Sequence, residues 1–84
     1  MTFLECCERV CEKGLCMIRP QKGHPAQYDL LPFENVEKEG WIWLDATTAN
    51  IVCQIYSVLS PDRQEKFRSL PASVILNFCW KVIQ

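Results

Sequence analysis

The last segment of the chain, residues 71–84, places the tightest constraint on the fold. Its polar side chains Ser73, Asn77 and Lys81 are four residues apart, so they fall on one narrow stripe of a helix. Nearly every other position in PASVILNFCWKVIQ is apolar. Because a helix that is apolar on most sides needs protein around it, the segment is predicted to be either the central helix of a small domain or one half of a subunit contact.

Length, composition and charge limit the classes of protein to which this chain can belong. The chain has 84 residues, 49% of them hydrophobic and 23% charged, which is typical of a folded domain and not of a disordered segment. We therefore expect a single domain, residues 1–84, whose small core would gain stability from a partner subunit. The net charge is -1, so the positive field that attracts nucleic-acid phosphates is missing and nucleic acid is not the expected partner.

A capping box marks the start of the first helix. The hydroxyl of Thr2 is spaced to accept from the backbone N–H of Glu5, whose carboxylate can reach back to residue 2. Apolar side chains then recur at intervals of three and four residues, and Gly14 supplies a left-handed end. The apolar positions of this helix are Phe3, Cys7, Val10 and Cys11.

Three short segments have the composition of strands, namely 15–19, 28–33 and 41–44. Because Pro32 cannot donate a ladder hydrogen bond, the second strand is predicted to lie at a sheet edge or to end before that residue. Glycine and proline predict a turn or loop between the first two strands, over residues 21–27, and a polar connector over 34–40 leads to the third.

Two more helices are predicted before the last one. The first is capped by Asp45, Thr47 or Thr48. Its apolar side is formed by Ile51, Val52, Ile55, Val58 and Leu59. The second covers roughly residues 61–68, begins at Ser60-Pro61 and points Phe67 and Leu70 inward. The order of elements predicts an α+β fold, with an N-terminal helix, a small three-stranded antiparallel sheet and three C-terminal helices packed on one face.

The tryptophan strand is apolar on both faces. Trp41 and Trp43 share one face by the two-residue period, while Ile42 and Leu44 share the other. The C-terminal helix can cover only one face, so the tryptophans are candidates for a contact with a subunit, a peptide or an aromatic ligand. The alternative is that one of them packs under the long loops. The residues expected at or beside a contact are Trp41, Trp43, Ile75, Phe78, Trp80 and Ile83.

The cysteines and the single histidine offer two other chemistries. Cys7 and Cys11, one helical turn apart, would form a zinc site together with Cys16 and His24. Their spacing is unlike a Cys-x-x-Cys knuckle, which favours instead an interpretation of these cysteines as small core residues. A nucleophile pair of Cys16 and His24 would need both side chains within hydrogen-bond reach.

The leading hypothesis is a small non-enzymatic protein-binding module without a cofactor, acting as a regulator, adaptor or inhibitor. Its partner would be another protein or a second copy of the chain, and one setting is a phage or mobile element directed at a host protein. No run approaches the ~20 apolar residues that cross a bilayer, and the N-terminus is not typical of a signal peptide. We therefore expect a cytoplasmic protein with reduced cysteines. The alternatives are a zinc-binding module that contacts nucleic acid and a Cys-dependent enzyme.

Overall fold

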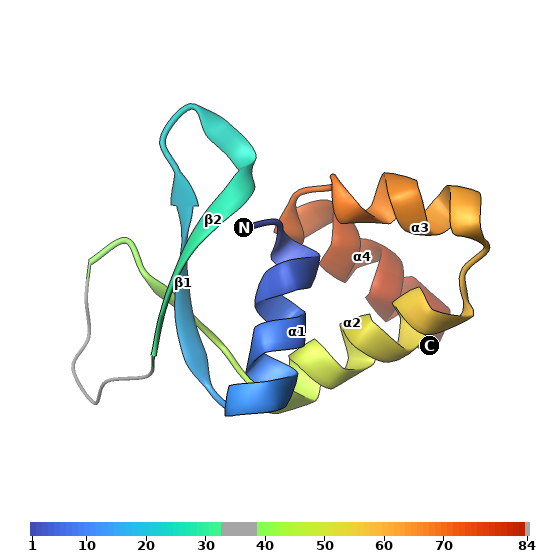
Figure 1. Cartoon of the computed structure of the whole chain (residues 1–84), viewed down its shortest axis with the longest axis horizontal. Helices are drawn as coiled ribbons and strands as arrows, with labels where there is room; N and C mark the ends of the chain where they lie inside the picture. Colours follow the sequence, from blue (N-terminus) through green and yellow to red (C-terminus); the bar gives the residue numbers. More distant parts are fainter. Residues whose placement is uncertain (33–38, 84) are drawn as a thin grey trace.

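A computed structural model describes residues 1–32 and 39–83 and confirms the predicted α+β class (Figure 1). The elements are α1 (Phe3–Lys13), β1 (Cys16–Gln21), β2 (His24–Pro32), β3 (Ile42–Leu44), α2 (Ala46–Val58), α3 (Pro61–Arg68) and α4 (Ala72–Ile83). Residue 33 and most of the predicted connector 34–40 lie outside the described residues. No helix within the described residues is long and apolar enough to cross a membrane.

The sheet has the strand order β2-β1-β3, with both pairs antiparallel. β2 is an edge strand, as Pro32 predicts, and this proline is part of the strand. The predicted loop 21–27 is wrong in length, because β2 already begins at His24 and only residues 22–23 form the turn. Gly23 provides the positive φ of 78° that this tight turn needs.

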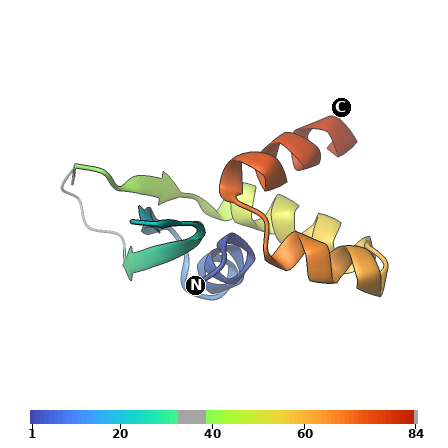
Figure 2. The same cartoon turned by 90° about the horizontal axis from the view of Figure 1, so that it is seen from above.

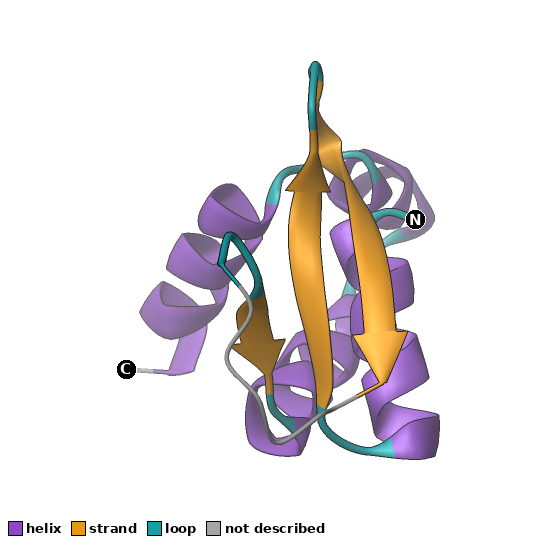
Figure 3. Ribbon diagram, turned by 90° about the vertical axis from the view of Figure 1, so that its left-hand side faces the viewer, coloured by secondary structure: helices purple, strands orange, loops and turns teal. Residues whose placement is uncertain are grey.

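The first helix, rather than the last, covers the sheet. α1 contacts β1, β2 and α2, whereas α4 packs mainly on α2. Figure 3 shows the sheet with the helices behind it, so that one sheet face points toward the helices and the other away from them. Phe3 of α1 meets Tyr28 of β2 with their ring centroids 5.8 Å apart. The core is therefore formed between the helix-side face of the sheet, α1 and α2.

Tyr28 ties three parts of the chain together. Its backbone N–H donates to the Met1 carbonyl over 2.7 Å, and its carbonyl accepts from the Met1 ammonium over 3.1 Å. Its hydroxyl accepts from the backbone N–H of Ala72 over 2.8 Å. That N–H opens α4 and has no partner within the helix. The start of α4 is thus held by a side chain from the edge strand.

Replacing Tyr28 with phenylalanine is expected to lower the free energy of unfolding by about 1–2 kcal/mol, because the N–H of Ala72 loses its acceptor. Urea unfolding measures this loss as a lower midpoint with an unchanged slope. Tyr56→Phe is the matched control, since the Tyr56 hydroxyl makes no hydrogen bond within the described residues. Equal losses in both variants would contradict the role given to the Tyr28 hydroxyl.

Candidate protein-binding surface

α4 buries only one row of its side chains. Ile75 and Cys79, one turn apart, are 0% and 2% exposed and face the core. The opposite row is polar and exposed, and consists of Ser73, Asn77 and Lys81. Figure 2 shows α4 along one side of the molecule next to α2. Of the two arrangements predicted for this helix, a central position is therefore not the one found, and Ile75 belongs to the core.

Both flanks of α4 remain apolar and open to solvent. One flank carries Val74, Phe78 and Val82, and the other carries Leu76, Trp80 and Ile83. Apart from Leu76, which is half-buried, these side chains keep between 37% and 54% of their surface exposed. Adjacent exposed side chains of this size on one helix form the largest unpartnered apolar feature that we find on α4.

The first flank borders a groove between α3 and α4. The open groove has a volume of about 270 Å³, and its apolar floor is formed by Leu59, Phe67, Leu70, Val74 and Phe78. The rings of Phe67 and Phe78 meet edge to face with centroids 6.1 Å apart, which joins the two helices beneath the groove. Arg63 and Lys66 of α3 complete its lining.

The two tryptophans of the third strand segment lie away from this groove. Trp43 is 57% exposed and pairs in register with Met17. Arg19 lies two residues beyond Met17, on the same sheet face, and its guanidinium carbon stands 4.6 Å from the centroid of the Trp41 ring. Trp41 and Trp43 thus share the face turned away from the helices (Figure 3), as the two-residue period predicts.

Trp41 belongs to a polar cluster on that face. Arg19 stacks on its ring and also forms a 3.0 Å ion pair with Asp29. Asp29 accepts a second hydrogen bond, over 3.1 Å, from Gln21. The bonds from Arg19 and then Gln21 hold the pKa of Asp29 below its usual value. Trp41 is half-buried and takes part in a cation–π contact, and Trp43 is the more accessible of the two rings.

The structure does not bring together the four residues of the alternative zinc site. Cys16 and His24 lie at opposite ends of the β1–β2 ladder, which separates them by about 16 Å at a rise of ~3.3 Å per residue. Cys7 is buried in the core, and Cys11 is exposed. Within residues 1–32 and 39–83, no group of three or more His, Cys, Asp or Glu side chains is placed to hold a metal ion.

The same separation keeps Cys16 and His24 from the hydrogen-bond contact that a nucleophile pair needs. The Cys16 thiol instead donates to the Gly14 carbonyl over 3.3 Å, and burial raises its pKa. Burial also raises the pKa of Cys6 to about 11 and that of Cys7 well above its usual range. These thiols therefore stay protonated near neutral pH, which lowers their nucleophilicity.

A contact between two thiols is the feature that sequence reasoning missed. Cys11 and Cys53 are 42 residues apart in the chain, yet their Sγ atoms lie 3.6 Å apart where α1 meets α2. The Cys11 thiol also lies 3.2 Å from the Oδ1 atom of Asn50, to which it donates. Burial and the neighbouring Cys11 raise the pKa of Cys53 to about 12. No spacing rule pairs such distant cysteines, so only the fold reveals the contact.

Treatment with hydrogen peroxide is expected to join Cys11 and Cys53 in a disulfide. The exposed Cys11 thiolate attacks the peroxide, which gives a sulfenic acid and hydroxide. Cys53 then displaces hydroxide from that sulfur. In total, two thiols and one peroxide yield a disulfide and two waters. Closing this 42-residue separation is expected to stabilise the fold by about 2–4 kcal/mol. Mass spectrometry of digests identifies the linkage, and Cys11→Ser is the control. A first linkage formed by Cys6, Cys7 or Cys79 would contradict the prediction.

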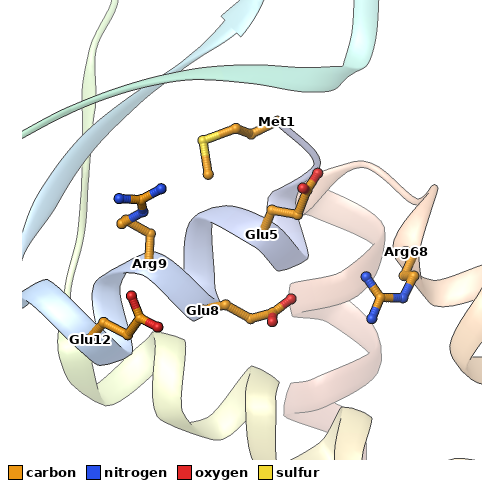
Figure 4. A pocket seen from close by; sticks show the side chains of 6 residues that line it. All are labelled: Met1, Glu5, Glu8, Arg9, Glu12 and Arg68. Atoms are coloured by element: carbon orange, nitrogen blue, oxygen red, sulfur yellow. The ribbon is translucent and has the colours of Figure 1, made fainter.

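A charged hollow lies over α1, lined by Met1, Glu5, Glu8, Arg9, Glu12 and Arg68 (Figure 4). Glu5 accepts from the Thr2 backbone N–H over 2.9 Å, and the Thr2 hydroxyl accepts from the Glu5 N–H over 3.2 Å, which confirms the predicted capping box. The bonds from Thr2 lower the pKa of Glu5. Arg68 meanwhile stacks on Tyr56 at 5.1 Å. Capping and stacking account for these two side chains, so we assign the hollow no ligand.

Comparison with known proteins does not assign the chain to a family. No protein-family model matches the chain, and neither the curated proteins nor the solved structures contain a significant match. The proposed function therefore rests on the surface of α4 and its surroundings.

Proposed function

We propose that this chain is a small non-enzymatic protein-binding module, a regulator, adaptor or inhibitor, that binds another protein through the apolar flanks of α4. The observation that carries the proposal is the exposure of large side chains on that helix. Trp80 and Ile83 are each 48% exposed, and Phe78 is 37% exposed. Single exposed apolar residues are common on monomers, whereas contiguous ones are typical of interaction sites.

The chemistry of the remaining side chains supports a binding role rather than a catalytic one. Cys16 and His24 stand at opposite ends of a strand ladder, and the buried thiols have raised pKa values. Tryptophan, in contrast, is a residue type that dominates the binding energy of interfaces. Trp80 is therefore the side chain from which we expect the largest contribution to partner binding.

Affinity capture with matched variants tests the proposal. Phe78→Ser, Trp80→Ser and Ile83→Ser together remove the three largest exposed apolar side chains of the flanks, whereas Ser73→Ala with Asn77→Ala alters only the polar row. We expect the wild type and the polar-row variant to retain one partner in equal stoichiometry and the apolar variant to lose it. Circular dichroism verifies that each variant is folded. Retention of the same proteins by all three chains would contradict the proposal.

A further inference from the structure

The groove between α3 and α4 has the size and lining of a site for protein side chains. Enclosed sites for small molecules usually measure ~300–1,000 Å³, whereas this groove is open and holds about 270 Å³. Its floor is apolar, and Phe67 and Phe78 form an aromatic base with centroids 6.1 Å apart. One or two apolar side chains of a partner would fill the space, with the rest of the partner lying across the two helices.

The rim of the groove is positively charged. Arg63 and Lys66 are three residues apart on α3, so they lie on the same side of the helix as Phe67 and Leu70. Within the described part of the chain, neither cation takes part in an ion pair. Two cations without an ion pair, beside an apolar floor, favour a partner that carries carboxylates next to its apolar residues.

The acidic residues of α3 lie beside this rim but do not line the groove. Asp62 and Glu65 line a neighbouring polar hollow, which Lys66 and Ser69 also line. Among the described residues, no Asp or Glu lines the groove itself. Arg63 lines the groove and not the hollow, and Lys66 borders both, so the groove side of α3 is cationic although the chain as a whole carries a net charge of -1.

We propose that this groove binds an amphipathic helical segment of another protein, with apolar side chains entering between α3 and α4 and Asp or Glu side chains pairing with Arg63 and Lys66. The inference rests on the proposed function and specifies the chemistry of its partner. Helices that bind in grooves present apolar residues at intervals of three and four, with polar residues alongside. This pattern matches an apolar floor with one charged rim.

A second copy of the chain fits the groove less well. α1 carries an acidic row, at Glu5, Glu8 and Glu12, but its large apolar residues Phe3 and Leu4 are 1% and 0% exposed, because they already form the core of their own molecule. α4 exposes apolar side chains but contains no Asp or Glu. Neither helix of a folded second copy therefore combines carboxylates with exposed large apolar side chains.

Selection from a displayed library of random peptides, each long enough for about four helical turns, tests the inference on the folded full chain. We expect the recovered peptides to contain large apolar residues at intervals of three and four and more Asp and Glu than the starting library. Amide signals from residues that line the groove, such as Phe67 and Val74, are expected to shift when a recovered peptide is added.

Charge reversal sharpens the test. In the variant with Arg63→Glu and Lys66→Glu, affinity for the acidic peptides is expected to fall about tenfold or more, and a new selection is expected to yield peptides rich in Lys and Arg. Phe78→Ser is expected to weaken binding as well. Asn77→Ala, in the polar row of α4, is the matched control and is expected to leave peptide affinity unchanged.

The possible outcomes separate this inference from the proposed function. Peptides that bind the Trp80 flank instead, or that bind equally after charge reversal, would overturn the inference and leave the proposed function standing. Failure to recover any peptide that contacts α4 would overturn both. The inference is also wrong if the chain dimerises through the groove in light scattering and becomes monomeric on Phe78→Ser, or if it binds phosphatidylserine vesicles and charge reversal abolishes that binding.

Discussion

Replacing Phe67 with alanine is expected to lower the free energy of unfolding by about 3–5 kcal/mol. Phe67 is 3% exposed and is the only fully buried residue of α3. Its ring lies 5.9 Å from that of Tyr56 and 6.1 Å from that of Phe78, which connects α3 to both α2 and α4. An eight-residue helix as polar as α3 has little stability alone, so loss of this ring releases it from the fold.

The size of the effect is large relative to the stability of a domain of this length. At ~0.05–0.15 kcal/mol per residue, a chain of 84 residues has about 4–13 kcal/mol in total. Urea unfolding measures the loss, and hydrogen exchange is expected to show the largest decrease in protection on α3. Val58→Ala is the control, because Val58 is 82% exposed and its replacement is expected to change stability by less than about 0.5 kcal/mol. A loss below about 1.5 kcal/mol for Phe67→Ala would contradict its role as the anchor of α3.

Structural features that depend on neighbouring residues, such as helix caps, are predicted well from the sequence. The capping box of Thr2 and Glu5 is formed, and Asp45 accepts from the Thr48 N–H over 2.8 Å at the start of α2. Ser60 precedes α3 and Pro61 opens it, although the Ser60 side chain makes no capping hydrogen bond. These signals act within one helical turn, so they need no knowledge of the tertiary structure.

Burial was predicted less well, because it depends on which elements meet. The periodicity predicts Val58 on the apolar side of its helix, yet it lies at the margin of the stripe centred on Val52 and ends α2 in solvent. Leu4 and Cys6 fall outside the apolar side that the periodicity predicts for the first helix, yet both are fully buried. α1 packs against the sheet on one side and α2 on another, so it buries a wider face than an amphipathic surface helix.

The sequence predicts which types of residue form the candidate site, but it does not predict how they are arranged. The apolar excess at Phe78, Trp80 and Ile83 follows directly from the composition of the last helix. The groove does not, because it requires Arg63 and Val74 to lie on facing helices. The distribution of the cations relative to the apolar floor is a tertiary property, and it is this distribution that indicates the charge of the partner.

Replacing Ile75 with alanine is expected to lower the free energy of unfolding by about 2–5 kcal/mol, whereas Ile83→Ala changes it by less than about 1 kcal/mol. The two isoleucines stand on the same helix and differ in environment, since Ile75 is 0% exposed and Ile83 is 48% exposed. Thermal unfolding measures the contrast, at ~4–8 °C per kcal/mol for a domain of 60–100 residues. Trp80→Ala is expected to behave like Ile83→Ala in this measurement.

For partner binding the order of the two variants is expected to reverse, so that Ile83→Ala has the larger effect and Ile75→Ala the smaller. Ile83→Ala removes exposed apolar surface from α4 and is expected to weaken binding, while the fraction of Ile75→Ala that remains folded keeps that surface intact. Binding measured at a temperature where both variants are folded separates the two effects. If folded Ile75→Ala lost the partner while Ile83→Ala retained it, the surface of α4 would not be the contact. A change in the core would then affect partner binding more than a change in the side chains that the partner is proposed to touch.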